Sequence, residues 1–332
     1  MPGKTNGESR RINLRETRRV LPTKSLTGQS SCRAGKSEND MIEFLTTLIN
    51  GLSLGGVYAL IALGYTMVYG IAKMLNFAHG DVIMVGGYSI YVFFNIIGQP
   101  LLAVLAAVVI CVVLGVVIEK VAYKPLRGAS PLAVLITAIG VSYFLQSIAQ
   151  IAFGSADKKM SAFSDLGMIK LGALSIRVST VLTLIVAAFI MITLTLFVNK
   201  TKVGKAMLAV SEDKGAAQLM GISSNAIIAL TFAIGSGLAA VAGAFYVLQT
   251  STVNVTMGAM PGIKAFTAAV IGGIGSIPGA MVGGLLLGII EQFCNSVPGL
   301  SNYTIAVEFA LLILILLVKP NGILGKKKRE KV

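Results

Sequence analysis

Long uncharged runs, separated by short charged segments, extend through residues 44–318. A bilayer core of ~30 Å is crossed by about 20 helical residues, and most of the runs are close to this length. The pattern therefore predicts eight membrane-spanning helices, near residues 46–70, 82–98, 101–118, 131–153, 178–198, 226–249, 266–290 and 303–318.

The composition of the chain agrees with a membrane location. It is 55% hydrophobic and 13% charged, whereas a soluble domain is about 25% charged. A water-soluble fold of this size could not bury so much apolar surface, so lipid is the expected solvent. We expect an all-α, polytopic membrane protein with about eight to ten transmembrane or re-entrant helical segments.

Basic residues predict which loops face the cytoplasm. Loops 119–127 and 199–214 are basic and lie two predicted spans apart, so the positive-inside rule places both in the cytoplasm. The basic tail at 325–331 follows three further spans, which would place it outside. One segment must therefore be broken. We expect this segment to be 265–290, as two half-helices or as a re-entrant segment plus a full span.

Glycine interrupts two runs near opposite ends of the membrane region, 44–72 and 265–290. The first run would be about 42 Å long as one helix, so we expect Gly51, Gly55 and Gly56 to break it. Glycine-interrupted membrane segments are the best sequence indication of a transport path. Glycines spaced four apart also suit close helix packing alone, and this alternative stays open.

The first 40 residues differ from everything that follows. They contain nine of the 28 lysine and arginine residues and no apolar run, which is typical of a disordered basic extension. A second interpretation, which we favour, is that the natural chain starts at Met41. We expect a transmembrane domain at 41–325 and a short basic tail at 326–332.

Motifs of autonomous catalysis are absent from the sequence. His79 is the only histidine, and the three cysteines have no metal-ligand or redox spacing. No G-x-x-x-x-G-K-[ST], H-E-x-x-H or G-x-S-x-G motif occurs. We expect a non-catalytic protein that binds no metal and no cofactor. Because the net charge of +14 lies in ends and loops, we also expect no nucleic-acid partner.

The stretch NFAHGD at 76–81 places polar side chains between two apolar runs. We interpret it as a short break whose polar groups face a helix start or a water-filled path, without acid–base chemistry. An alternative role for Asp81 is to cap the helix N-terminus. The expected translocation path or gate comprises Asn76, His79, Asp81, Gly273, Gly275 and Pro278.

Two further ionisable residues lie in or beside apolar runs, Lys264 and Glu308. Charged side chains are costly in lipid and are candidates for function by default. Snorkelling of each side chain to the membrane interface explains both residues without a function, and we favour this reading.

The segment 204–232 is too apolar for a solvated linker and too charged for a span. It suits a short cytoplasmic helix, with Ser-Glu-Asp at 211–213 capping its start and Gly221 ending it. Such a helix suggests a docking element for a partner protein. The alternative is a surface helix that packs on the chain's own loops.

Residues 215–221, GAAQLMG, resemble the E-A-A-x-x-x-G coupling motif of ABC-importer permeases, with Gly215 in place of the glutamate. Longer blocks carry a more specific resemblance over about 41–332. They are NGLSLGGVYALIALGYTMVYGI (50–71), NFAHGDVIMVGGY (76–88), VAYKPLR (121–127), SEDKGAAQLMGI (211–222), GIKAFTAAVIGGIGSIPGAMVGG (262–284) and LLVKPNGILG (316–325). In these blocks the chain resembles the permease subunits of branched-chain amino acid ABC importers, and more specifically the first of that system's two permeases.

The resemblance implies an all-helical permease of the bacterial inner membrane. Its partners would be a second homologous permease, two cytoplasmic P-loop ATPases and a periplasmic binding protein that captures leucine, isoleucine, valine or a related amino acid. ATP hydrolysis would occur on the ATPases. The coupling loop, about 199–225, would dock into them through Gly204, Lys205, Glu212, Asp213, Ala216, Ala217 and Gly221.

Two alternative functions remain open at the level of sequence. The same machinery could carry urea, short amides or another amino acid, because the substrate is selected largely by the binding protein. A stand-alone secondary transporter or channel is disfavoured, because it would need a chain of buried ionisable residues for ion coupling.

Overall fold

The computed structural model describes residues 27–325 except 161–162, 164–165 and 172–173. Residues 42–325 of this range belong to one compact unit, and the residues before Ile42 belong to another. The expectations for residues 1–26 and for the basic tail 326–332 lie outside the described residues. Helix α1 (Thr27–Ala72) includes residues 27–40, where the sequence predicted disorder. Extending a formed helix adds one hydrogen bond per residue without a new nucleus.

Eight helical segments in the described part of the chain are long and apolar enough to cross a membrane. They are formed by α1, α2 (His79–Ile97), α3 (Pro100–Ile118) with its extension to Leu126, α4 (Pro131–Phe153), α6 (Val178–Lys200), α9 (Ser224–Thr250), α11 (Ile277–Ser296) and α12 (Thr304–Val318) with the preceding turn η3 (Ser301–Tyr303). The shorter apolar helix α10 (Ala259–Gly272) precedes α11. The chain is thus a multi-pass, all-α membrane protein, as its sequence predicted.

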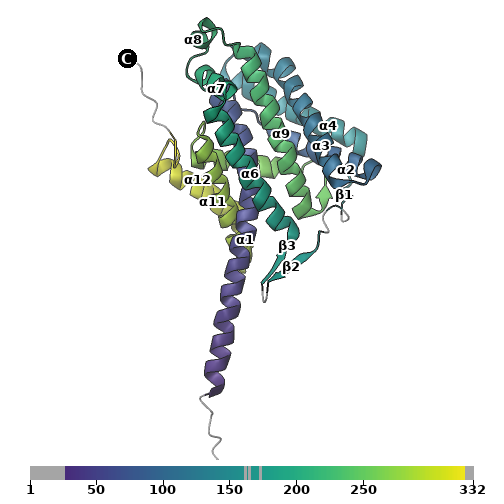
Figure 1. The fold of residues 1–332 in the computed structure, drawn as a ribbon, viewed down its shortest axis with the longest axis vertical. Coiled ribbons are helices and arrows are strands. Elements are labelled where there is room, and N and C mark those ends of the chain that lie inside the picture. The colour runs from purple at the N-terminus through teal and green to yellow at the C-terminus, as the bar shows by residue number, and fades with distance from the viewer. Residues whose placement is uncertain (1–26, 161–162, 164–165, 172–173, 326–332) are drawn as a thin grey trace, which may run out of the picture. The chain divides into compact units, whose positions relative to one another are not determined.

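The described strands are short and join helix ends. Strand β1 (Lys158–Lys159) pairs antiparallel with β4 (Thr252–Val253), so that Lys158 lies opposite Val253. Strands β2 (Met168–Leu171) and β3 (Leu174–Arg177) form an antiparallel hairpin directly before α6. Two short helices, α7 (Lys202–Glu212) and α8 (Lys214–Leu219), follow the opposite end of α6 (Figure 1).

Helix α9 forms the centre of the bundle. Its most apolar stretch is 67% buried, whereas the corresponding stretch of α12 is only 11% buried. Small residues allow α2 and α3 to approach α9 closely: a Cβ added to Gly86 would lie 3.1 Å from the Ala240 Cα, and one added to Gly115 would overlap Ser236. The exposed faces of α12, α3 and α4 are apolar, as expected for surfaces that meet lipid or another membrane chain.

The expected break in α1 is absent, because its glycines serve helix packing. A Cβ on Gly51 would lie 2.9 Å from the Ile289 Cα, and one on Gly55 would lie 2.8 Å from the Leu285 Cα. Gly288 faces Gly55 in return. The small-residue spacing of α1 therefore fits against that of α11, and the helix continues to Ala72.

The glycine-rich run 265–290 is broken, as the distribution of basic loops required. Helix α10 ends at Gly272 and α11 begins at Ile277. Because α10 has only 14 residues, it is too short for a full crossing, which needs about 20. A re-entrant segment followed by a full span places the end of α12 on the same side as α7 and α8.

Candidate translocation gate and docking element

The first of two breaks joins α1 to α2. Helix α1 ends at Ala72, Lys73 adopts a left-handed conformation with φ of 58°, and α2 begins at His79. Asn76, His79 and Asp81 are all buried. The first turn of α2 therefore starts inside the bundle, and irregular backbone at membrane depth occurs only where protein or a cavity surrounds it.

The three polar side chains of this break have separate partners. The Asn76 Oδ1 accepts a hydrogen bond of 2.8 Å from the Tyr123 hydroxyl, and the Asp81 Oδ1 accepts one of 2.7 Å from the Gln146 Nε2. The His79 ring meets the Tyr65 ring edge-on, with 4.7 Å between centroids. Asp81 lies in the first turn of α2, where the helix dipole favours its charge, and the N-cap position itself is occupied by Ala78.

The second break lies between α10 and α11. Gly273 and Gly275 have φ of 108° and 92°, values that strain any residue with a Cβ. The Ser276 Oγ caps α11 by accepting from the Gly279 N–H at 3.3 Å, and Pro278 lies in the first turn. The chain after α12 closes the end of α10, because the Ile323 and Leu324 N–H groups donate to the Ile271 and Gly272 carbonyls.

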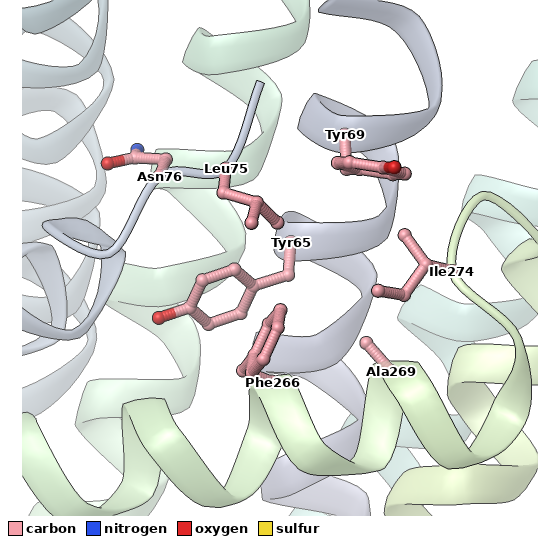
Figure 2. Close-up of a pocket in the computed structure, with 7 residues that line it drawn as sticks. All are labelled: Tyr65, Tyr69, Leu75, Asn76, Phe266, Ala269 and Ile274. Carbon is pink, nitrogen blue, oxygen red and sulfur yellow. The ribbon is translucent and has the colours of Figure 1, made fainter. Parts of the chain in front are cut away.

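The two breaks, 73–78 and 273–276, face each other, and we call them together the gate. A narrow pocket between them is lined by Tyr65, Tyr69, Leu75, Asn76, Phe266, Ala269 and Ile274. Figure 2 shows the Leu75, Phe266 and Ile274 side chains directed toward Tyr65, whereas the Tyr65 hydroxyl and the Asn76 amide point away from Ile274. The pocket wall is therefore mostly apolar and aromatic. Of the six predicted gate residues, only Asn76 belongs to the lining of this pocket. Gly273 and Gly275 flank the lining residue Ile274, and His79 contacts the lining residue Tyr65. Pro278 lies in the first turn of α11, and Asp81 contacts Gln146 of α4.

Two sets of contacts reach the gate, one from α8 and one from the start of α9. The Lys214 Nζ at the start of α8 donates to the Ala72 carbonyl, the last of α1, at 3.1 Å. Arg127 contacts both Asn225, at the start of α9, and the buried Glu119. Glu119 begins a short π-helix (η1, Glu119–Tyr123) that ends with the tyrosine bonded to Asn76.

Lys214 is thus a positively charged side chain at a helix C-terminus, where unpaired carbonyls and the dipole both favour it. Partial burial lowers the pKa of Lys214, and the nearby Arg127 guanidinium lowers it further. Both effects follow because the Lys214 side chain lies against the end of α1 and near Arg127 rather than in open solvent.

The docking element comprises α7, α8 and the turn to residue 221. The Thr201 Oγ1 caps α7 by accepting from the Gly204 N–H at 3.0 Å. The Asp213 Oδ1 caps α8 by accepting from the Gly215 and Ala216 N–H groups at 2.8 and 3.0 Å. Gly221, with φ of 81°, follows the end of α8. The sequence predicted a cap within Ser-Glu-Asp at 211–213 and the stop at Gly221, but for one short helix where the structure has two.

The predicted contact residues of this element divide into two groups. Gly204 and Ala217 are buried against their own chain and are not available to a partner. Lys205, Glu212, Asp213, Ala216 and Gly221 are exposed. Leu219 and Met220, which the sequence analysis did not select, are 91% and 82% exposed. Their signal in the sequence is a pair of large apolar residues just before a helix-ending glycine.

A group of buried charges lies elsewhere in the bundle. The Lys264 Nζ contacts the Glu291 Oε1 at 2.6 Å and the Glu308 Oε1 at 3.1 Å, and the Tyr58 hydroxyl donates to the Glu291 Oε2 at 2.7 Å. The expected snorkelling of Lys264 and Glu308 is therefore wrong, because the two side chains pair inside the bundle. Glu291 was missed, since it follows the last residue of its uncharged run. Within the described residues, no three His, Cys, Asp or Glu side chains are arranged to hold a metal ion.

In the described part of the chain, eight helical segments that can cross a membrane and two broken connections between helices define a multi-pass membrane protein. The family model described as "Branched-chain amino acid transport system / permease component" matches residues 47–316, and the chain belongs to this family. It is 44% identical to the high-affinity branched-chain amino acid transport system permease protein BraD of Pseudomonas aeruginosa, over 88% of this chain and 99% of that protein. It is also 44% identical to LivH of Escherichia coli K12, over 87% and 98% of the two chains. A solved chain of PsaBC from Streptococcus pneumoniae overlaps 83% of this chain and 92% of its own, with 16% identity and a TM-score of 0.44.

Proposed function

We propose that this chain is the permease subunit of an ATP-binding-cassette importer that carries leucine, isoleucine, valine or a related amino acid across the bacterial inner membrane. Its membership of the permease family and the names of its relatives support this function. The structural observation that carries it is the capped helix α8, which presents Leu219 and Met220 to a partner. Exposed large apolar side chains at a rigid helix end are suited to fill a pocket on another protein.

The partners follow from this function. Two cytoplasmic P-loop ATPases bind the docking element and hydrolyse ATP, so this chain needs no cofactor of its own. A second homologous permease completes the membrane path, and the sparsely buried surface of α12 suits a contact with it. A periplasmic binding protein delivers the amino acid.

Movement of the docking element reaches the gate through the contacts described above. When the ATPases close on nucleotide, α8 moves, and the hydrogen bond from Lys214 to Ala72 moves the end of α1 with it. The start of α9 moves Arg127 through its contact with Asn225. Arg127 in turn contacts Glu119 of η1, the segment that ends at Tyr123, which donates to Asn76. Both routes end at residues 72–78, one side of the gate. Nucleotide binding thereby shifts the equilibrium between two conformations of residues 72–78.

The experiment that tests this function is co-purification of the tagged chain with its ATPase in mild detergent. We expect Leu219→Glu to abolish recovery of the ATPase while the second permease is still recovered. The matched control is Leu300→Glu, because Leu300 is also exposed but lies in the turn between α11 and η3. Full recovery of the ATPase with Leu219→Glu would contradict docking through α8. Leucine uptake by the chain alone, without any ATPase, would instead identify a stand-alone carrier.

A further inference from the structure

The charge cluster, formed by Tyr58, Lys264, Glu291 and Glu308, joins four helices inside the membrane region. These residues lie on α1, α10, α11 and α12, respectively. Tyr58 is 14 residues before the end of α1, which is about 21 Å along the helix. Glu291 is equally far from the start of α11. The cluster therefore lies within the hydrocarbon depth, about two-thirds of the way from the cytoplasmic ends of these helices.

The cluster is unbalanced in charge and in hydrogen bonding. Two carboxylates share one ammonium group, so the ionised cluster has a net charge of −1. The Glu308 Oε2 is buried and meets no N–H or O–H donor among the described residues, the Glu291 carboxyl being a neighbouring group, and Glu308 as a whole is only 1% exposed. An unpaired buried carboxylate oxygen is costly, because it loses its water without gaining a donor.

Lys264 has more donors than these contacts use. An ammonium group has three N–H donors, and the two carboxylates take two of them. In the described part of the chain, the Nζ makes no contact with a third oxygen acceptor, and it lies 5.9 Å from the centroid of the Tyr58 ring. The Glu308 Oε2, an acceptor, and the remaining donor of the Lys264 Nζ thus belong to the two partners of one ion pair.

We propose that the charge cluster is a passage site for the charged head group of an α-amino acid, in which Glu308 receives the α-ammonium and Lys264 the α-carboxylate. A zwitterion is the ligand class that supplies both missing partners without adding net charge. In lipid such a ligand needs both partners at once, because each of its charges would otherwise lose its hydration uncompensated. This site rests on the proposed function and assigns the head-group contact to named residues.

The position of the cluster also allows a substrate to reach it by movement of α12. Glu308 belongs to α12, the least buried of the eight spans. Tyr58 and Glu291 belong to α1 and α11, whose facing glycines hold those two helices tightly together. A shift of α12 relative to this fixed pair separates Glu308 from Lys264 and opens the ion pair to the substrate. Helices with few buried contacts are the ones that move most readily.

The test uses the complete importer in proteoliposomes, with its binding protein and leucine as the probe. Glu308→Gln keeps the shape of the side chain but removes the charge that the α-ammonium needs. We expect leucine uptake to fall by about tenfold or more, the effect of losing a hydrogen bond to a charged group. ATPase activity stimulated by the binding protein should remain within about twofold, since neither the docking element nor the periplasmic surface is altered. The control is Glu43→Gln, at an exposed carboxylate of α1.

Three results would overturn the site. Wild-type uptake with Glu308→Gln would show that the carboxylate is protonated or merely structural. Restored uptake in the charge-swapped variant Lys264→Glu with Glu308→Lys would identify an ionic lock between α10 and α12. Loss of stimulated ATPase activity in parallel with uptake would assign Glu308 to assembly. Absence of ATP-driven uptake in the unaltered importer would instead refute the proposed function, so the two failures are distinguishable.

A second measurement does not depend on the folding of any variant. Leucine at millimolar concentration, without binding protein, should raise the thermal unfolding temperature of the unaltered permease pair. An equal concentration of sodium chloride should not. No shift with leucine, or an equal shift with sodium chloride, would overturn the proposal, the latter by assigning the site to an inorganic cation.

Discussion

Two glycine-rich stretches of this protein have similar compositions and opposite structures. Residues 44–72 form part of one unbroken helix, whereas residues 265–290 are divided between α10 and α11. Gly51 and Gly55 have ordinary helical backbone and face α11, while Gly273 and Gly275 have positive φ. Glycine therefore does not by itself break a membrane helix.

The difference lies in what replaces the lost backbone hydrogen bonds. At the second break, the N–H groups of Ile323 and Leu324 satisfy carbonyls of α10, and the Ser276 hydroxyl caps α11. Residues 44–72 keep their own helical hydrogen bonds, which satisfy their backbone N–H and C=O groups in lipid. The contrast teaches that a break requires both a permissive backbone and a partner from elsewhere in the chain.

The largest effect is expected at Gly273. In Gly273→Ala, the new Cβ would lie 2.6 Å from the Gly325 nitrogen, on a backbone with φ of 108°. Strain and overlap together should cost about 2–5 kcal/mol, so little folded protein should reach the membrane. Size-exclusion chromatography of detergent extracts measures this. A normal monodisperse peak would mean that the break does not need glycine.

The next effect is expected where the two glycine stretches meet. In Gly288→Ala, the added Cβ would overlap the Gly55 nitrogen and Cα, so α1 and α11 must separate. The cost should be about 1–3 kcal/mol, visible as a lower thermal unfolding temperature of the purified protein. An unchanged temperature would show that the glycines of α1 are not there for packing.

A smaller effect is expected from Lys214→Met, which keeps the apolar stem and removes the cap on α1. The loss of one charged hydrogen bond to the Ala72 carbonyl should cost about 1.5 kcal/mol or somewhat more. Leucine uptake should fall several-fold while the ATPase still co-purifies, because the docking surface remains. If uptake and ATPase activity stay coupled as in the wild type, Lys214 does not link α8 to the gate.

The smallest effect is expected from Gly70→Ala, at the end of α1 that faces the second break. The added Cβ would lie 3.4 Å from the Gly275 Cα, at ordinary contact distance. Stability should change by less than about 0.5 kcal/mol, which makes this variant the matched control for Gly273→Ala in the same extraction assay. A large loss of folded protein would mean that the two breaks are packed more tightly than their contacts indicate.

The sequence was sufficient for the features that depend on local pattern. Run lengths predicted the spans, basic loops required a broken segment in 265–290, and Asp213 and Gly221 marked the ends of α8. The features that it missed depend on distant partners. The glycines of α1 could not be assigned to packing without α11, and Lys264 could not be paired with Glu308, 44 residues away. Only the structure shows that Leu219 and Met220 are exposed while the neighbouring Ala217 is buried.

The most direct test of the gate is a disulfide across it, between Gly70→Cys and Gly275→Cys. A Cβ on either residue would lie within 3.8 Å of the other's Cα, which is short enough for a bridge. Because Gly275 has φ of 92°, the Gly275→Cys single variant is strained, and its uptake under reducing conditions sets the reference rate. In the reconstituted importer, oxidation of the double variant should stop ATP-driven leucine uptake and reduction should restore it to that reference rate, while oxidation changes neither single variant. Uptake at the full rate with the disulfide formed would contradict a gate at these two breaks.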